Sequence, residues 1–254
     1  PANFSSRING FCVKELGEIK SQRNLINLFK HNSILQYNKN TGRYYIISPF
    51  EYDFEYISNR EQYCGIDLGI RTFATVYSNN KTSEIGTNLI PKIDLHNKKM
   101  DKIKSDKDSN IITENKYKKI LNKYGGKMRN RIDDLHKKVS VFLCERFENI
   151  HLGKISTKSI VSNENGNLKE INKRRMSVLS FYKFMEKIQL MGKKYKSNIK
   201  LIDEYNTSKM CHNCGHIKKD LGAKKVYECK ECKIKIDRDI NASINIYNKG
   251  FLLE

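Results

Sequence analysis

Residues 63–78, YCGIDLGIRTFATVYS, contain two β-rich runs, which predict two strands joined by a tight turn. Side chains alternate between the two faces of a strand, so Asp67 points away from the face of its two apolar neighbours. Gly65 and Gly69 share the face of Asp67 and are expected to leave space beside its carboxylate for an ion or a phosphate backbone. An aspartate beside a glycine is also a common turn residue, so this stretch predicts strands and makes Asp67 a candidate functional acid.

Strand-like and helix-like patterns mix along the rest of the chain. ENIHLGKIS at 148–156 and NIKLIDEY at 198–205 predict further strands. Helical spacing predicts amphipathic helices near residues 132–142 and 176–189, and the polar stretch at 162–173 predicts a mobile loop. The inward stripes are Ile132, Leu135, Val139 and Phe142 in the first helix, and Met176, Leu179, Tyr182, Met185 and Gln189 in the second. This mixture predicts an α/β fold with a central mixed sheet.

The charge balance is strongly basic. The 254 residues include 48 Lys and Arg against 28 Asp and Glu, a formal net charge of +20. Such an excess attracts polyanions and makes binding salt-dependent, although a ribosomal-type or membrane-surface protein can show the same balance. Residues 92–138 alone carry 15 basic and 7 acidic side chains, a local charge of +8. No apolar run approaches the roughly 20 residues of a membrane span, no signal peptide opens the chain, and its start at Pro1 leads us to expect missing upstream sequence.

Four of the seven cysteines form two CxxC pairs, CHNC at 211–214 and CKEC at 229–232, with 14 residues between them. In a reducing, intracellular setting this spacing favours zinc over disulfides. The predicted ligands are Cys211, Cys214, Cys229 and Cys232. Four thiolates leave no open coordination position, so we expect this zinc to be structural.

Acidic residues follow the second cysteine pair almost at once, in DRDINASINI at 237–246. Asp239 falls where a helix is expected to begin. Helix capping would explain Asp237 or Asp239 singly. Carboxylates are hard ligands, suited to magnesium or manganese rather than to the zinc of the cysteines.

Five motifs, in this order, carry a resemblance to a known family. They are GIDLGIRTFATVYS, RNRIDDLHKK, NTSKMCHNCG, the CKEC pair and DRDINASINI. Together they resemble the nuclease half of transposon-encoded TnpB proteins, and still more closely their eukaryotic and viral relatives, the Fanzor proteins. The resemblance covers roughly residues 60 to 250.

The resemblance implies a RuvC-type, RNase-H-like nuclease fold with an inserted zinc ribbon. It also implies RNA-guided cleavage of DNA with two divalent metal ions, and therefore guide RNA and target DNA as partners. The implied domains are the C-terminal part of a β-rich, guide-RNA-binding wedge domain (1–60), a RuvC-like nuclease domain (61–206), a zinc ribbon that binds target nucleic acid (207–235), and the C-terminal segment of the RuvC-like domain (236–254).

Carried over by position, Asp67 matches the first catalytic acid of the family and Asp239 the last. Where most TnpB proteins have the middle glutamate, this chain has Gly153, which cannot hold a metal. Fanzor-like members use a displaced glutamate, and Glu204 stands at that place. The resemblance thus implies that Asp67 bridges two Mg²⁺ or Mn²⁺ ions, and that Glu204 and Asp239 each hold one. Alternatively, Glu204 is a solvated strand end or a partner for a nearby lysine.

Several basic and aromatic side chains are candidates for nucleic-acid contacts. Arg238 is expected near the scissile phosphate, with Asp237 supporting the site, and the lysine-rich stretch 92–138 is expected to line a heteroduplex channel. His136 is expected to be structural. The candidate phosphate contacts on the ribbon loop are Lys218, Lys219, Lys224 and Lys225, for which a solvated face is an equal alternative, and Tyr182 and Phe184 are expected to pack in the core rather than to stack on bases.

The sequence therefore favours an RNA-guided DNA endonuclease of the Fanzor type. Two alternatives remain: a non-cleaving RNA-guided DNA-binding protein disarmed at Gly153, and a zinc-ribbon RNA-binding protein unrelated to cleavage. We expect no membrane association. The expected location is intracellular, in the nucleus if the host is eukaryotic and otherwise in the cytoplasm.

Overall fold

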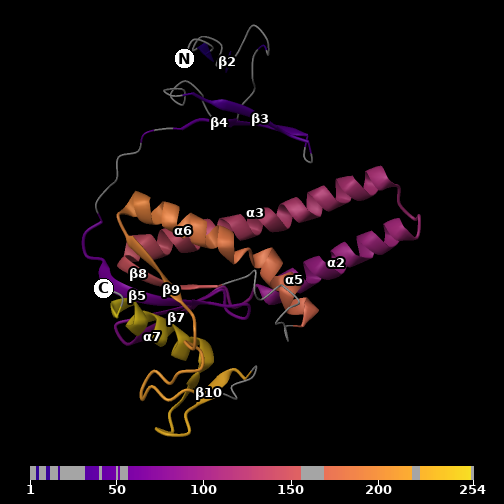
Figure 1. Ribbon diagram of the computed structural model, residues 1–254. Coiled ribbons are helices and arrows are strands. Elements are labelled where there is room, and N and C mark those ends of the chain that lie inside the picture. The colour runs from indigo at the N-terminus through magenta and orange to yellow at the C-terminus, as the bar shows by residue number, and fades with distance from the viewer. Residues whose placement is uncertain are drawn as a thin grey trace. The chain divides into compact units, whose positions relative to one another are not determined.

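The chain divides into two compact units, Pro1–Asp53 and Phe54–Glu254, seen in the computed structural model of Figure 1. The structure describes residues 4–5, 10–11, 17, 32–39, 42–49, 51, 57–155, 169–218 and 224–252. Among the helices of these residues, none has the length and apolar character needed to cross a membrane.

The first unit contains antiparallel strand pairs. β1 (Phe4–Ser5) pairs with β2 (Gly10–Phe11), and β3 (Ile34–Asn38) pairs with β4 (Arg43–Ile47). Gly42 closes the second hairpin with φ +65°, a conformation that glycine adopts without strain, and its N–H donates to the carbonyl of Asn38 at 2.8 Å. The expected β-rich character of this region is thus present in the residues described.

The second unit is built on a five-stranded mixed sheet in the order β7-β6-β5-β8-β9. The strands are β5 (Glu61–Leu68), β6 (Ala74–Ser78), β7 (Lys81–Ile85), β8 (Phe147–Lys154) and β9 (Asn198–Asp203). β5, β6 and β7 form an antiparallel meander, whereas β8 and β9 continue parallel to β5. The predicted α/β fold with a mixed sheet is therefore confirmed, including strands where 63–78, 148–156 and 198–205 were expected.

Helices cover the sheet (Figure 1). On one side lie α2 (Ile90–Asp108), α3 (Glu114–Arg146), α5 (Glu170–Leu179) and α6 (Phe181–Tyr195). α7 (Arg238–Phe251) packs against β5, β6 and β8 from the other side. Ile66 and Leu68 are buried in the main core, so Asp67, which alternates with them, faces the α7 side. The sheet thus separates a large apolar core from the layer that carries the acids.

The helix predicted over 176–189 is broken at Ser180, where φ 49° and ψ 54° place the backbone in the left-handed region. Because the break changes the helix direction, the expected stripe does not continue unaltered. Phe184 is fully buried as expected, whereas Tyr182 is 62% exposed, contrary to its expected packing in the core. In α3, Phe142 is 44% exposed although it belongs to the predicted stripe.

His136 on α3 is structural, as expected. Its side chain is buried, its Nε2 donates to the carbonyl of Leu179 at 2.9 Å, and its ring stacks on Phe73 at 5.5 Å between centroids. The predicted mobile loop at 162–173 lies largely outside the described residues, and its last residues, from Glu170, form the first turn of α5.

Candidate functional site

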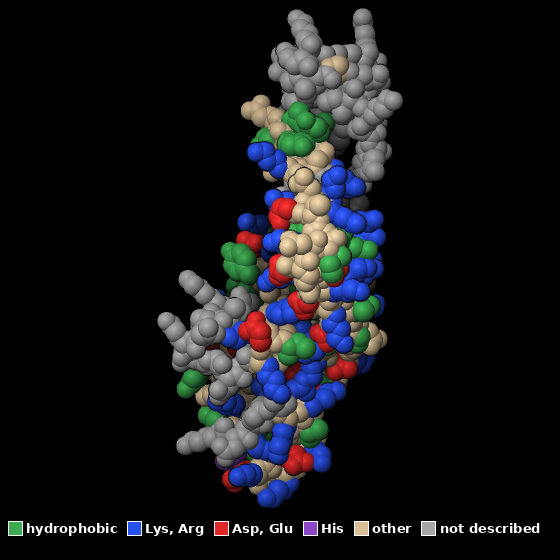
Figure 2. Space-filling view, turned by 90° about the vertical axis from the view of Figure 1, so that its right-hand side faces the viewer, with side chains coloured by type: hydrophobic (Ala, Val, Ile, Leu, Met, Phe, Trp, Pro, Cys, Tyr) green, Lys and Arg blue, Asp and Glu red, His purple; other side chains and the backbone are tan. Residues whose placement is uncertain are grey.

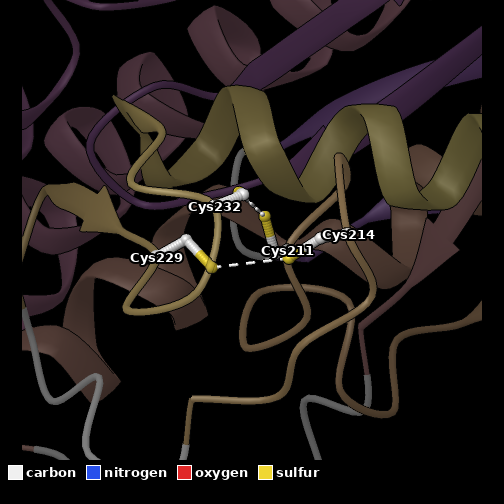
Figure 3. Close-up of side chains that lie close together, drawn as sticks. All are labelled: Cys211, Cys214, Cys229 and Cys232. Carbon is white, nitrogen blue, oxygen red and sulfur yellow. Dashed lines mark hydrogen bonds between the residues drawn. The ribbon is translucent and has the colours of Figure 1, made fainter.

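The four cysteines of the CxxC pairs converge on one point (Figure 3). Their sulfur atoms all lie within 4.8 Å of one another, with 3.6 Å between Cys211 and Cys232 and 3.5 Å between Cys214 and Cys229. A tetrahedral zinc with Zn–S bonds of about 2.3 Å requires sulfurs about 3.8 Å apart. The four side chains could therefore bind a metal such as zinc.

Two turns present these sulfurs. After the first pair, Gly215 has φ +75°, and the N–H of Cys211 donates to the carbonyl of His216 at 2.9 Å. The second pair follows β10 (Val226–Glu228), which pairs with β11 (Lys235–Asp237). Hydrogen bonds from the side chain of Asn213 and the backbone of Ile234 lower the pKa of Cys232 to about 6. A thiolate is thus favoured at this position, whereas burial raises the pKa of Cys211 to about 12.

Three predicted acids line one cavity of about 710 Å³. Asp67 lies near the carboxyl end of β5, Glu204 directly follows β9, and Asp239 lies in the first turn of α7. β5 and β9 run in the same direction in the sheet, so their carboxyl ends meet at one edge, where α/β proteins commonly place their ligands. The structure therefore brings together side chains that are up to 172 positions apart in the sequence.

The electrostatics of this cavity disfavour three negative charges. Burial raises the pKa of Asp67 well above its usual value, and the carboxylates of Glu204 and Asp239 raise it further. Burial, with a smaller effect of Asp203, raises the pKa of Glu204 to about 7. Burial and the neighbouring Asp237 also raise the pKa of Asp239. A bound cation would offset this repulsion and favour the ionised forms.

Glu204 occupies space that exists because residue 153 is glycine. A Cβ added to Gly153 on β8 would lie 2.4 Å from Oε1 of Glu204 and 2.9 Å from Cδ1 of Ile246. The Oε1 atom of Glu204 is buried and has no hydrogen-bond partner. A buried carboxylate oxygen without a partner carries a desolvation cost that a cation would relieve. These donors therefore fit a divalent ion.

The carboxylates are spaced more widely than the cysteines. Within the described part of the chain, the cysteine cluster is the one group of three or more His, Cys, Asp or Glu side chains whose ligand atoms all lie within 4.8 Å. Two ions about 3.5–4 Å apart, each bound at about 2.0–2.1 Å, allow ligand oxygens to be on the order of 4–8 Å apart. A spacing above 4.8 Å between these carboxylates is therefore compatible with bound divalent ions.

Gly65 does not leave space for an ion, contrary to our expectation. A Cβ at this position would lie 2.5 Å from the carbonyl of Ser243 and 2.5 Å from Cβ of Tyr247. Gly65 therefore allows α7 to pack closely on β5, and this contact fixes the helix that carries Asp239. Gly69, by contrast, borders the cavity beside Asp67.

Asp237 and Asp239 have separate positions at the start of α7. Asp237 is the N-cap, and its Oδ1 accepts from the backbone N–H groups of Asp239 at 2.8 Å and Ile240 at 3.4 Å. Because the carboxylate of Asp237 accepts the hydrogen bonds of the helix N-terminus, the carboxylate of Asp239 is not needed as a cap and can face the cavity. Arg238 also lines the cavity, and its expected place near the scissile phosphate stays a prediction.

Other cavity residues were not predicted. Arg71 lies in the turn that follows the strand of Asp67, and its guanidinium acts to lower the pKa of Asp239. Its place four residues after a candidate acid was the signal in the sequence. Arg175 comes from α5 and forms an ion pair with Asp94, a contact that could not be read from the sequence.

The ribbon lysines contact their surroundings in different ways. Lys218 donates to the carbonyl of Glu228 at 3.0 Å, and Lys225 forms an ion pair with Asp237 at 3.5 Å. Lys224 is exposed, and Lys219 lies outside the described residues. Their expected phosphate contacts stay predictions.

Comparisons with known proteins identify relatives of this chain. Residues 181–246, which include all four cysteines, match the family model "Cas12f1-like, TNB domain". TnpB-like protein L770 of Acanthamoeba polyphaga mimivirus is 39% identical over 248 residues, which are 95% of this chain and 47% of the relative. The chain is homologous to TnpB-like proteins. TnpB-like protein L79 of the same virus is 38% identical over 255 residues, 98% of this chain and 48% of the relative.

The chain spans about half the length of the curated relatives it matches. Among solved structures, it is similar to a chain of a Cas12f1–sgRNA–target DNA complex, with a TM-score of 0.53, 21% identity, and coverage of 81% of this chain and 53% of that one. A CRISPR–Cas12f ternary complex gives a TM-score of 0.55 at 19% identity, over 81% of this chain and 42% of that one. At these identities the likeness establishes the α/β fold alone.

Proposed function

We propose that this chain is the nuclease half of an RNA-guided DNA endonuclease of the TnpB type, with a Fanzor-like displaced glutamate and a RuvC-like, RNase-H-like fold. The observation that carries the proposal is the cavity shared by Asp67, Glu204 and Asp239. The homology to TnpB-like proteins and the fold shared with Cas12f chains, one of them in a complex with sgRNA and target DNA, support it.

In this proposal the acids would hold two divalent ions, Mg²⁺ or Mn²⁺, with Asp67 shared by both ions and Glu204 and Asp239 each serving one of them. Bound ions of this kind supply an activated water and stabilise the leaving oxygen of a phosphodiester. The chain's own contribution is positional: the Asp237 cap fixes the turn of α7 that carries Asp239. Arg238 and Arg71 provide positive charge beside the acids, where a substrate phosphate would lie.

The cysteine cluster holds a structural zinc and forms a zinc ribbon at 207–235, between the nuclease segments 61–206 and 236–254. Residues 1–60 belong to a wedge domain that binds guide RNA. The ribbon lysines and the lysine-rich α2 and α3 contact the phosphates of guide RNA and target DNA. Lys and Arg side chains are spread over the face seen in Figure 2, with fewer acidic side chains among them. This distribution supports contacts with the phosphate backbone of a nucleic acid.

A non-cleaving RNA-guided DNA-binding protein is the second candidate. It is favoured by the absence of a carboxylate at Gly153. A zinc-ribbon RNA-binding protein is less well supported, because such a protein does not need three acids in one cavity.

Cleavage of a matched DNA by the protein with its co-purified RNA, in the presence of Mg²⁺, tests the proposal. We expect cleavage by wild type and a rate at least about 100-fold lower for Glu204→Gln and for Asp67→Asn, because each removes an ion ligand. Glu186→Gln, at an exposed position on α6, is the matched control and should cleave normally. Absence of cleavage by wild type with Mg²⁺ or Mn²⁺ would support the non-cleaving candidate, and normal cleavage by Glu204→Gln would exclude Glu204 as the middle acid.

A further inference from the structure

Two fully buried asparagines, Asn241 and Asn245, lie one turn apart on α7 and donate out of their own helix. The side-chain amides of both donate to the carbonyl of Met210 at 2.7 Å. Asn245 also donates to the carbonyl of Thr207 at 2.7 Å. In the other direction, the backbone N–H of His212 donates to Oδ1 of Asn241 at 3.0 Å. Buried amides need partners, so these contacts fix the segment 207–212 against α7.

This asparagine bridge (Asn241, Asn245 and the backbone of 207–212) contacts the cysteine cluster directly. Cys211 stands between the two bonded residues Met210 and His212. A metal that fixes the sulfur of Cys211 therefore also fixes the backbone groups that the asparagines bind.

The same bridge reaches two of the candidate acids. The N–H and hydroxyl groups of Thr207 donate to the carbonyl of Glu204 at 3.1 and 3.0 Å, and the carbonyl of Thr207 in turn accepts from Asn245. On α7 itself, Asp239 precedes Asn241 by two residues in a continuous helix. One set of buried hydrogen bonds thus links the cysteine cluster to the backbone of both Glu204 and Asp239.

We propose that Asn241 and Asn245 are positioning residues that couple metal binding at the four cysteines to divalent-ion binding at the acids. This inference rests on the proposed function, because it takes the acid cavity to be an ion site. Coupling between two sites is reciprocal, so an ion at the acids also raises the affinity of the cysteines for zinc. Zinc then does more than stabilise its own segment, because it also fixes the positions from which Glu204 and Asp239 bind an ion.

Manganese binding, followed by electron paramagnetic resonance on the purified chain with and without zinc, tests the coupling. For wild type, removal of zinc should lower the Mn²⁺ affinity at least about fivefold, the low end of typical allosteric couplings. The double variant Asn241→Ala/Asn245→Ala, with zinc bound, should have a Mn²⁺ affinity as low as that of zinc-free wild type. Removal of zinc from this variant should change its Mn²⁺ affinity little. Ser243→Ala is the matched control, since Ser243 is fully buried on the same helix but donates within it, to the carbonyl of Ile240.

Equilibrium competition for zinc against a chelator that scarcely binds Mg²⁺ provides a second measurement, which does not need a folded zinc-free protein. Addition of Mg²⁺ should raise the apparent zinc affinity of wild type and of Ser243→Ala at least about fivefold, and that of the double variant by much less. Circular dichroism checks that each zinc-loaded variant is folded.

The outcomes separate the two proposals. Mn²⁺ binding that Asp67→Asn does not weaken would contradict the ion site, and with it both the proposed function and the coupling. Mn²⁺ binding that depends on Asp67 but is indifferent to zinc and to the asparagine variants would overturn the coupling alone.

Discussion

At the scale of single residues, the position of one carboxylate depends on a missing side chain. Glu204 extends from the end of β9 into space beside Gly153 on the neighbouring strand, and its Oε1 lies where a Cβ would collide with it. The absence of a side chain at Gly153 thus makes room for a carboxylate from the next strand. The two positions are physically coupled, although they lie 51 residues apart.

Gly153→Ala should therefore lower DNA cleavage without removing any atom of the site. The added Cβ would approach Oε1 of Glu204 at 2.4 Å and displace it, so we expect DNA cleavage to fall at least about tenfold. Overpacking should also lower the free energy of unfolding by about 1–3 kcal/mol. Cleavage rates and thermal unfolding check both effects. Gly126→Ala, whose Cβ would meet only a side-chain nitrogen of Arg129 at 3.9 Å, is the control, and full activity of Gly153→Ala would contradict the account.

Among the helices, apolar spacing in the sequence predicted one helix correctly and failed to predict a break in another. α3 was predictable because its apolar residues recur at helical spacing, and it buries Ile132 and Val139 as expected. The break at Ser180 could not be predicted, because apolar residues recur at helical spacing on both sides of it. A single residue with left-handed backbone angles does not change that spacing. β8 and β9 could be predicted as strands, but their adjacency, which brings Gly153 to Glu204, depends on tertiary structure.

The burial of His136 predicts that acid destabilises the contact of α3 with Leu179 of α5. Burial lowers the pKa of His136 in the folded chain below the value of about 6.5 in the unfolded chain. The unfolded state therefore binds the proton more tightly, and the stabilisation is fully present above pH of about 6.5 and is lost as the pH falls below it. Thermal unfolding between pH 7.5 and 5.5 should show a steeper loss for wild type than for His136→Gln. Equal pH dependence of the two proteins would contradict this prediction.

In the described part of the segment that carries the cysteines, the buried hydrophobic cluster consists of Cys211, Tyr227 and Cys229. We infer that so small a core needs a metal for stability. We expect about one zinc per chain by elemental analysis, and Cys229→Ser should lose it and become susceptible to proteolysis within 207–235. Cys64→Ala, in the main core, should keep its zinc. Full zinc retention by Cys229→Ser would contradict a four-cysteine site.

At the scale of the whole molecule, the net charge of +20 and the local +8 of residues 92–138 predict binding dominated by phosphate contacts. Lys119 and Lys123 are exposed on α3. Replacing both by glutamine should weaken RNA binding and reduce the slope of log affinity against log salt by about 2, because each lysine neutralises one phosphate. The charge-preserving pair Lys119→Arg/Lys123→Arg is the control. An unchanged slope for the glutamine variant would show that this face does not bind phosphates.

The sequence indicated which acids are candidates for the site better than it indicated how the fold positions them. Asp67 and Asp239 could be selected from strand alternation and the start of a helix. Asp237 caps α7 and Asp239 lines the cavity. These separate roles could be assigned only from the backbone geometry. The role of Gly65 was misread because its neighbour is α7, some 180 residues later in the chain.

Anomalous scattering from Mn²⁺ in crystals of the protein would locate divalent ions at the three acids. We expect manganese peaks in the cavity bounded by Asp67, Glu204 and Asp239, with a peak lost in Glu204→Gln. A cavity without a peak at saturating Mn²⁺, or peaks that Glu204→Gln leaves unchanged, would contradict the proposed ion site.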